Sequence, residues 1–167
     1  YNWYAVDDDR GICPEGYHIP SDEEFKNLER YLGMSEVEVD NFVWRGENEG
    51  GKIKEAGHEH WNFYSDEITE EVTNETGYSA LPSGFRYSNG SYGNIKSYTV
   101  FWSTTLSNSG IPLRRALEYN KNSISRTDDS KEYGFSVRCL SDETLNTTIL
   151  VPENFATIQA AIDYSID

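Results

Sequence analysis

The feature that most constrains the fold is a pair of cysteines near opposite ends of the chain. Cys139 lies in the segment 133–140, whose alternation places Phe135, Val137 and Cys139 on one face of a predicted strand. The other cysteine, Cys13, precedes the first clear helix start. A disulfide between them would tie the beginning of the chain to its end and could stabilise the fold by up to about 5 kcal/mol in the chain-entropy model. Two separate buried thiols are the alternative.

Helix and strand signals predict a mixed α+β fold. Ser21 and Glu24 form a capping box at the start of one helix, and Ser35 and Glu38 form a second, which predicts another helix before residue 46. The expected strands cover residues 1–6, 98–105, 113–119, 123–126 and 132–140.

The region over residues 47–97 has little apolar periodicity and many turn-forming residues. Its larger apolar side chains are mainly aromatic, among them Trp61, Tyr78 and Phe85. We therefore expect long loops that are held in place by buried aromatic side chains.

The chain is strongly acidic, with 29 Asp and Glu against 14 Lys and Arg, for a formal net charge of −15. Such a surface repels phosphate groups, which argues against binding to nucleic acid or to anionic membranes. No stretch approaches the roughly 18 continuous apolar residues of a membrane-spanning helix, so we expect no membrane insertion.

A series of short motifs is similar, in the same order, to those of one family. The motifs are YNWYAV, GICPEGYHIPSDEEF, GGKIKEAG, HWN, TNETGYSALPSGFR, NGSYGNI, FWSTT and YGFSVRCL. Over roughly residues 1–141 the chain resembles the Fibrobacter succinogenes major paralogous domain. The resemblance implies a C-type-lectin-like fold, with two helices flanking a small twisted antiparallel sheet. It also implies that the two ends of the domain meet and that Cys13 is bridged to Cys139 in the last strand.

The sequence changes character after residue 141. Residues 145–163 resemble the entry to a right-handed parallel β-helix of the pectin-lyase-like type, in which a strand precedes a short capping helix. We therefore divide the chain into a domain over residues 1–143 and a linker with a truncated β-helix segment over residues 144–167. The natural chain is expected to continue into a second domain, and the first residue is interpreted as a trimmed or processed end.

The sequence contains no recognised catalytic motif: no P-loop, nucleophile elbow, dinucleotide-binding turn or Cys-x-x-Cys. His58 and His60 lack a third ligand at a useful spacing, so we expect them to be ordinary exposed or hydrogen-bonded side chains. The formylglycine-generating enzyme is a relative by fold, but its activity depends on a reactive cysteine pair. Because Cys13 and Cys139 are both assigned to a structural bridge, we expect no enzymatic activity.

The candidate binding site is the segment 118–130, which is rich in Asn, Ser, Asp and Tyr. Paratopes and sugar sites use such side chains for adaptable hydrogen bonds and flat aromatic contacts. The resemblance places this segment, with the loop before Trp102, on the ligand face of a C-type-lectin-like domain. The candidate ligand contacts are Tyr119, Asn120, Asn122, Arg126, Asp128 and Trp102. An ordinary polar hairpin is the alternative.

Calcium is the candidate ion. Asp128 and Asp129 could supply carboxylate ligands. The Trp-Asn-Asp pattern of calcium-dependent sugar-binding lectins is absent, because Trp102 is followed by Ser103 and Thr104. The acidic run at residues 7–9 is interpreted as a solvated turn.

Together these features predict a non-catalytic recognition or adhesion module that binds a glycan or a surface protein as a monomer. A long-range disulfide favours an extracellular or bacterial cell-surface location. Three alternatives remain: a spacer or cap for an adjacent β-helix, a diversified variable protein of a retroelement system, and a module that assists a polysaccharide-cleaving β-helix.

Overall fold

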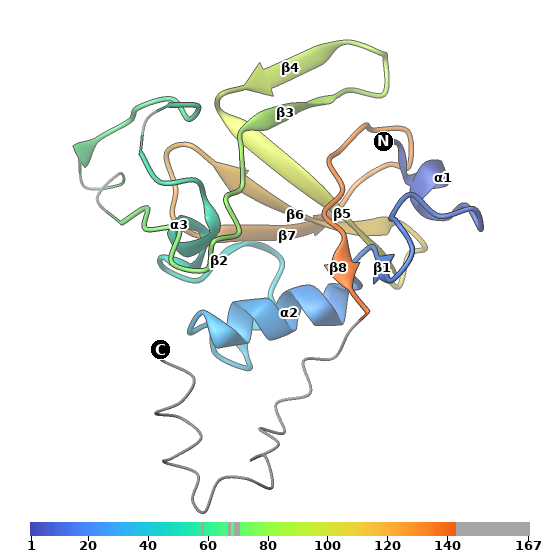
Figure 1. The fold of residues 1–167 in the computed structure, drawn as a ribbon, viewed down its shortest axis with the longest axis horizontal. Helices are drawn as coiled ribbons and strands as arrows, with labels where there is room; N and C mark the ends of the chain where they lie inside the picture. The colour runs from blue at the N-terminus through green and yellow to red at the C-terminus, as the bar shows by residue number, and fades with distance from the viewer. Residues whose placement is uncertain (58, 67, 69–70, 143–167) are drawn as a thin grey trace, which may run out of the picture.

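A computed structural model describes residues 1–142 except residues 58, 67, 69 and 70. The described part is an α+β fold with a mixed six-stranded sheet and a separate two-stranded sheet (Figure 1). The predicted β-helix segment over residues 144–167 lies outside the described residues.

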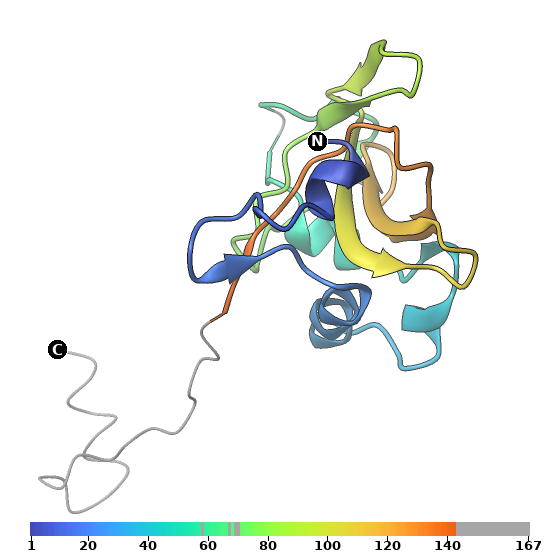
Figure 2. The ribbon, with the colours of Figure 1, turned by 90° about the vertical axis from the view of Figure 1, so that its right-hand side faces the viewer.

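The main sheet has the strand order β2-β7-β6-β5-β3-β4. Its strands are β2 (Val43–Arg45), β3 (Ser83–Arg86), β4 (Tyr92–Ile95), β5 (Tyr98–Leu106), β6 (Pro112–Glu118) and β7 (Ile124–Asp128). β3 and β5 are parallel and the other neighbours are antiparallel, so the sheet is mixed. The predicted wholly antiparallel sheet is therefore wrong. The β3–β4 hairpin projects away from the other strands (Figure 2).

The helices are α1 (Trp3–Val6), α2 (Asp22–Tyr31) and α3 (Glu49–Ile53), with a 3-10 turn η1 (Glu38–Asp40). α2 begins at the predicted capping box of Ser21 and Glu24. The hydrogen bonds of the second capping box, between Ser35 and Glu38, also form, but they close a turn that leads only into η1, whose own N-cap, Val37, makes no side-chain bond. The predicted second helix is wrong because the backbone is extended at Asn41 and then enters β2. None of the helices in the described part of the chain is long and apolar enough to cross a membrane.

The first residues form the helix α1 and not the predicted strand. Asn2 caps this helix, since its side chain accepts a hydrogen bond from the backbone N–H of Ala5 at 3.2 Å. Trp3 and Val6 are both buried. Residues three apart share one face of a helix but lie on opposite faces of a strand, so only the helix buries both side chains together.

A continuous strand was predicted over residues 132–140, but the structure does not form it. Gly134 and Ser136 make isolated bridges to Arg86 and Phe101, and the only strand here is β8 (Leu140–Ser141), which pairs with β1 (Tyr17–His18). The predicted inward direction of Phe135 is nevertheless correct, because its side chain is buried.

The predicted disulfide between Cys13 and Cys139 is confirmed, with the two Cα atoms 5.8 Å apart. The beginning and end of the domain also meet through the backbone, where the N–H of Phe135 donates to the carbonyl oxygen of Tyr1 at 2.9 Å. Figure 1 shows β1 and β8 side by side, with α1 beside the segment that leads into β8.

The predicted role of aromatic side chains in the central loops is confirmed in part. The Trp61 side chain is buried, and its Nε1 donates to the carbonyl oxygen of Ala80 at 3.0 Å. Phe63, Tyr64 and Tyr92, by contrast, are exposed. The region also contains α3, β3 and β4, which its weak periodicity did not reveal.

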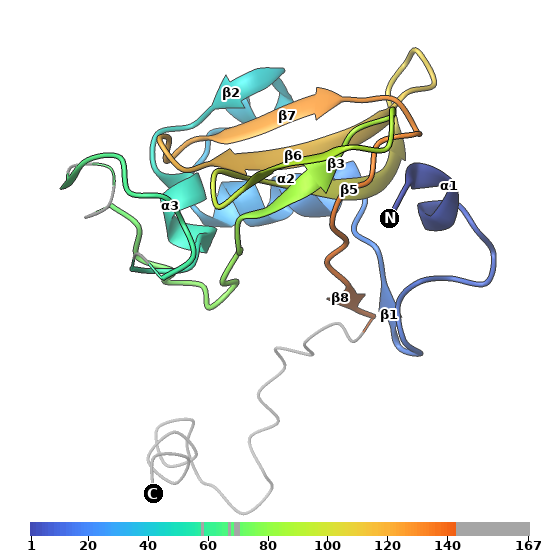
Figure 3. The ribbon, with the colours of Figure 1, turned by 90° about the horizontal axis from the view of Figure 1, so that it is seen from above.

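The main sheet separates two apolar clusters. One face packs against α2, where Phe25 and Leu32 meet Phe101, Leu117 and Ile124. Figure 3 shows α2 running along this side of the sheet. The second cluster contains Trp3, Val6, Ile19, Val100, Trp102, Ala116 and Phe135, which brings α1 and the segment before β8 onto β5.

A network of buried charges attaches α2 to the sheet. Asp22 of α2 pairs with Arg115 of β6 at 2.6 Å and with Arg126 of β7 at 2.7 Å. Glu29, two turns further along α2, pairs with Arg115 at 2.6 Å and with Arg45 of β2 at 2.5 Å. Burial alone would raise the pKa of Asp22, but the hydrogen bonds and charges of Arg126 and Arg115 hold it well below its usual range.

Candidate functional site

The residues predicted to bind a ligand are not brought together into one surface. Trp102 is 0% exposed, within the cluster that contains Phe135. Arg126 is buried against Asp22 and belongs to the network that holds α2. Asn122 is 3% exposed. These three predicted contacts therefore have structural roles, because their side chains are enclosed by the fold.

The bonds of Asn122 show why it is enclosed. Its Nδ2 donates to the carbonyl oxygen of Ile68 at 2.9 Å and to the Glu71 carboxylate at 2.8 Å. Its Oδ1 accepts from the buried Lys54 ammonium at 3.3 Å. Burial lowers the pKa of Lys54 to about 8. Asn122 thus joins the β6–β7 turn to the loops around α3.

Tyr119 and Asn120 are half-buried in the β6–β7 turn. The Tyr119 ring packs against the cluster on the α2 side and meets the Tyr64 ring edge-on, with centroids 5.8 Å apart. The side-chain oxygen of Asn120 accepts from Lys121 Nζ at 3.4 Å.

Asp128 and Asp129 are the predicted calcium ligands. Asp128 lies two residues after Arg126 on β7, so the alternation of the strand directs it to the α2 side of the sheet. The Asp129 carboxylate instead accepts from Arg114 Nε at 2.7 Å, and Arg114 belongs to the opposite face. The two carboxylates do not converge, and one of them is already paired with a cation.

Polar and aromatic side chains gather on the sheet face opposite α2. Arg115 points to α2, so Arg114 and the alternate residues of β6 lie on the other face. The strand register aligns this face across β2, β7, β6 and β5. We call it the polar face; its half-buried side chains are Trp44, Tyr98, Arg114, Glu118 and Thr127.

Close contacts order the polar face. The rings of Trp44 and Tyr98 meet edge-on, with centroids 6.3 Å apart and planes at 84°. Lys121 Nζ lies 4.9 Å from the centroid of the Trp44 ring and donates to the Glu118 carboxylate at 2.5 Å. Burial raises the pKa of the Tyr98 hydroxyl, which therefore remains a neutral donor and acceptor.

A hollow of about 380 Å³ lies between the polar face and the β3–β4 hairpin. Its polar lining comes from Asn94, Arg114, Glu118 and Asp129, and its aromatic lining from Phe85, Tyr87, Tyr98, Tyr133 and Phe135. Asn94 Nδ2 donates to the Tyr87 hydroxyl at 3.0 Å, which fixes one wall. Small-ligand sites combine such a mainly aromatic lining with a few convergent polar groups, and this volume is at the lower end of their range.

A larger hollow of about 670 Å³ lies on the other side of the same hairpin. Two of its hydroxyl groups already bond each other, since Ser83 Oγ lies 2.9 Å from Ser136 Oγ. Only one charged side chain, Arg86, lines it. The smaller hollow offers more unlike charges at close range and is the stronger candidate for a binding site.

The sequence analysis did not identify Tyr98 and Arg114 as site residues, although it predicted both strands that carry them. It included Glu118 as the first residue of the segment 118–130 but not among the candidate ligand contacts. The alternation along residues 98–102 and 114–118 indicates which side chains share a face of each strand, because every second residue points to the same side. What the sequence lacked was the register that sets Tyr98 opposite Glu118.

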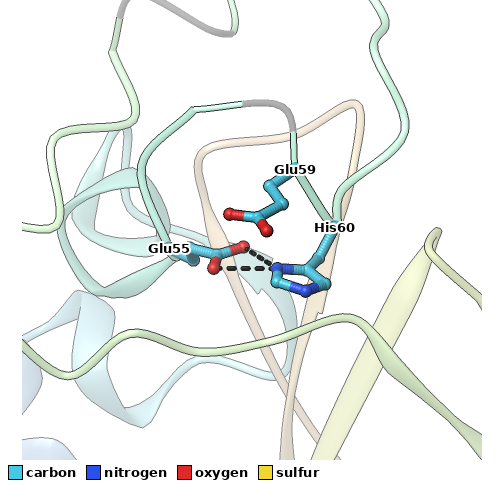
Figure 4. Close-up of side chains that lie close together, drawn as sticks. All are labelled: Glu55, Glu59 and His60. Carbon is cyan, nitrogen blue, oxygen red and sulfur yellow. Dashed lines mark hydrogen bonds and ion pairs between the residues drawn. The ribbon is translucent and has the colours of Figure 1, made fainter.

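Within the described residues, one group of side chains that could hold a metal ion lies away from the polar face, in the loop after α3. It consists of Glu55, Glu59 and His60 (Figure 4).

Comparison with family models matches residues 1–141 to the Fibrobacter succinogenes major domain. Comparisons with curated proteins and with solved structures found no match. The matched stretch covers the whole described fold apart from its last residue. The chain therefore belongs to the Fibrobacter succinogenes major domain family.

Proposed function

We propose that this domain is a non-catalytic recognition module that binds carbohydrate, as a monomer, in the hollow beside its polar face. The observation that carries the proposal is the meeting of aromatic rings with Arg114, Glu118 and Asp129 around one hollow of about 380 Å³. Sugars present hydroxyl groups that need both donors and acceptors, together with apolar faces that pack on flat rings. The hollow supplies both kinds of contact.

A carbohydrate fits this surface better than a protein partner does. Stable protein interfaces have an apolar, charge-depleted centre. Here the centre holds an Arg114–Asp129 pair at 2.7 Å and a Glu118–Lys121 pair at 2.5 Å. A ligand rich in hydroxyl groups can bond to these charged groups without leaving them unpaired.

An extracellular or cell-surface location belongs to the same proposal. The Cys13–Cys139 disulfide supports it, because structural disulfides persist mainly in oxidising compartments. The meeting of the domain's two ends, at the disulfide and between β1 and β8, supports a C-type-lectin-like fold.

A spacer beside a β-helix is the second candidate function. It is favoured by the way β8 is held, since β1 and the disulfide both fix the strand that precedes residues 144–167. A β-helix attached there would be joined to a rigid element. This role predicts that the isolated domain binds no glycan.

Glycan-array screening followed by calorimetry tests the binding proposal with two variants, Tyr87→Ala and Glu118→Gln. Each removes one contact from the hollow, and we expect affinity to fall by at least about tenfold, which corresponds to about 1.4 kcal/mol. The matched controls are Tyr31→Ala and Glu36→Gln. Tyr31 is 83% exposed on α2, and Glu36 pairs with Arg30 at 2.9 Å just beyond that helix.

The controls should bind as the wild type does, because α2 lies on the opposite side of the sheet. Equal losses in test and control variants would contradict binding at the polar face. Absence of glycan binding by the wild type would favour the spacer role.

A further inference from the structure

The loop between α3 and β3 brings together three side chains that ligate metals. One ligand atom from each of Glu55, Glu59 and His60 lies within 4.8 Å of the others. Figure 4 shows the Glu59 carboxylate turned toward the other two side chains. Glu59 and His60 are adjacent in sequence, and Glu55 lies four residues before Glu59. A single short loop therefore supplies all three side chains.

The spacing within this group suits a small metal ion. His60 Nδ1 lies 2.9 Å from both carboxylate oxygens of Glu55. Zinc binds nitrogen and oxygen ligands at about 2.0–2.2 Å, so neighbouring ligand atoms on one ion are about 3.0–3.4 Å apart. Glu55 and His60 are already close to that separation, and rotation of the exposed Glu59 side chain would bring in the third ligand.

The rest of the protein holds both ends of this loop. At its start, the backbone N–H of Glu55 donates to the carbonyl oxygen of Ala80 at 3.1 Å. Directly after His60, Trp61 Nε1 donates to the same carbonyl oxygen at 3.0 Å. The N–H of Asn62 then donates to the carbonyl oxygen of Lys96 at 2.8 Å. Ligands on a loop anchored in this way lose less conformational entropy when an ion binds.

We propose that Glu55, Glu59 and His60 form a binding site for a divalent transition-metal ion, with Zn²⁺ as the probe that identifies it. An imidazole nitrogen with two carboxylates is a ligand set for zinc-class ions, whereas calcium requires six to eight oxygens. Two carboxylates and a neutral imidazole carry two negative charges, which a dication neutralises. Three protein ligands leave a coordination position for water or for an external ligand.

Another histidine supplies a matched control. His18 also contacts two carboxylates, but Nδ1 bonds Asp142 at 2.5 Å while Nε2 bonds Glu24 at 2.8 Å. Carboxylates on opposite ring nitrogens cannot meet at one ion. At His60, both contacts with Glu55 converge on Nδ1. The two histidines therefore have similar partners, but only His60 has the geometry for chelation.

The test is calorimetric titration of the purified domain with Zn²⁺, in buffer with excess Mg²⁺ to occupy non-specific carboxylates. We expect one bound Zn²⁺ per chain, with affinity at least about tenfold weaker in His60→Gln and in Glu55→Gln. His18→Gln should retain wild-type affinity. Thermal unfolding in EDTA should give the same midpoint for His60→Gln and the wild type, which separates loss of a ligand from loss of the fold.

Three results would overturn the proposal: no stoichiometric Zn²⁺ binding, unchanged affinity in His60→Gln, or equal loss in His18→Gln. Co²⁺ provides an independent measurement, since its visible absorption reports nitrogen and oxygen coordination directly. A Co²⁺ spectrum that does not change between wild type and Glu55→Gln would likewise exclude this site.

Discussion

Asp22 is the residue on which the attachment of α2 most depends. Its carboxylate bonds Arg115 and Arg126, and all three side chains are buried. Asp22→Asn keeps the shape but leaves the buried Arg126 without its counter-charge and Arg115 with Glu29 alone. We therefore expect a loss of about 3–5 kcal/mol in the free energy of unfolding. Urea denaturation measures it. Asp8→Asn, which removes an ion pair with Arg10 in an exposed turn, should have no measurable effect.

The same carboxylate makes stability depend on pH. Because the folded-state pKa of Asp22 lies below its ordinary value of 3.8, the native state binds fewer protons than the unfolded state in acid. Its contribution is fully present above about pH 4 and is lost as pH falls through the folded pKa. The stability difference between wild type and Asp22→Asn should therefore shrink below pH 4. A difference that stays constant down to pH 2 would contradict this account.

Single residues also show what the sequence could and could not predict about the site. Residues 118–130 were predicted to form a polar binding segment because of their side-chain types, but Arg126 is buried, since Asp22 supplies its counter-charge. Nothing within the segment indicated that partner, which lies 104 residues away. Arg114, in contrast, lies outside this segment on a strand that was predicted, and the sequence did not show the register that places this strand beside Tyr98.

At the scale of elements, two identical capping boxes lead to different structures. Ser21 and Glu24 start the ten-residue helix α2, which buries Phe25 and Glu29. Ser35 and Glu38 close a turn that leads only into the three-residue 3-10 helix η1. A cap stabilises a helix that has a face to bury, but it does not determine how long that helix continues. This is why the first helix could be predicted and the second could not.

A comparison of the two caps tests this reasoning. Ser21→Ala removes the acceptor for the Glu24 N–H at the start of the helix that carries the buried network, and should cost about 1 kcal/mol of unfolding free energy. Ser35→Ala removes the same kind of bond, at the same 3.3 Å, from an exposed single turn and should cost less. Chemical denaturation of both variants gives the comparison. A larger loss for Ser35→Ala would mean that η1 contributes more to the fold than its length indicates.

At the scale of the whole molecule, the end segments are held to the sheet by packing as well as by the disulfide. Trp3 of α1 is buried beside Trp102, and its Nε1 donates to the carbonyl oxygen of Ser103 at 3.0 Å. Phe135 lies 4.3 Å from the Trp102 ring, centroid to centroid. The sequence predicted that the ends meet, through Cys13 and Cys139. The strand that it predicted for each end is wrong, because segments this short take the backbone conformation that buries their large side chains.

The disulfide should therefore add stability without determining the fold. The loop that it closes spans 126 residues, and the chain-entropy model gives up to about 5 kcal/mol for such a loop, with about 2–5 kcal/mol typical when a native bridge is removed. We expect Cys13→Ser with Cys139→Ser to unfold at lower denaturant while keeping wild-type secondary structure, because Trp3, Trp102 and Phe135 still pack together. Dithiothreitol-treated wild type is the control and should match the double variant.

Hydrogen exchange of the double variant should show the first loss of protection at β1 and β8, where the pairing is only two residues long. An unfolded double variant would show that packing alone cannot close this fold, and an unchanged denaturation midpoint would show that the bridge adds nothing to it.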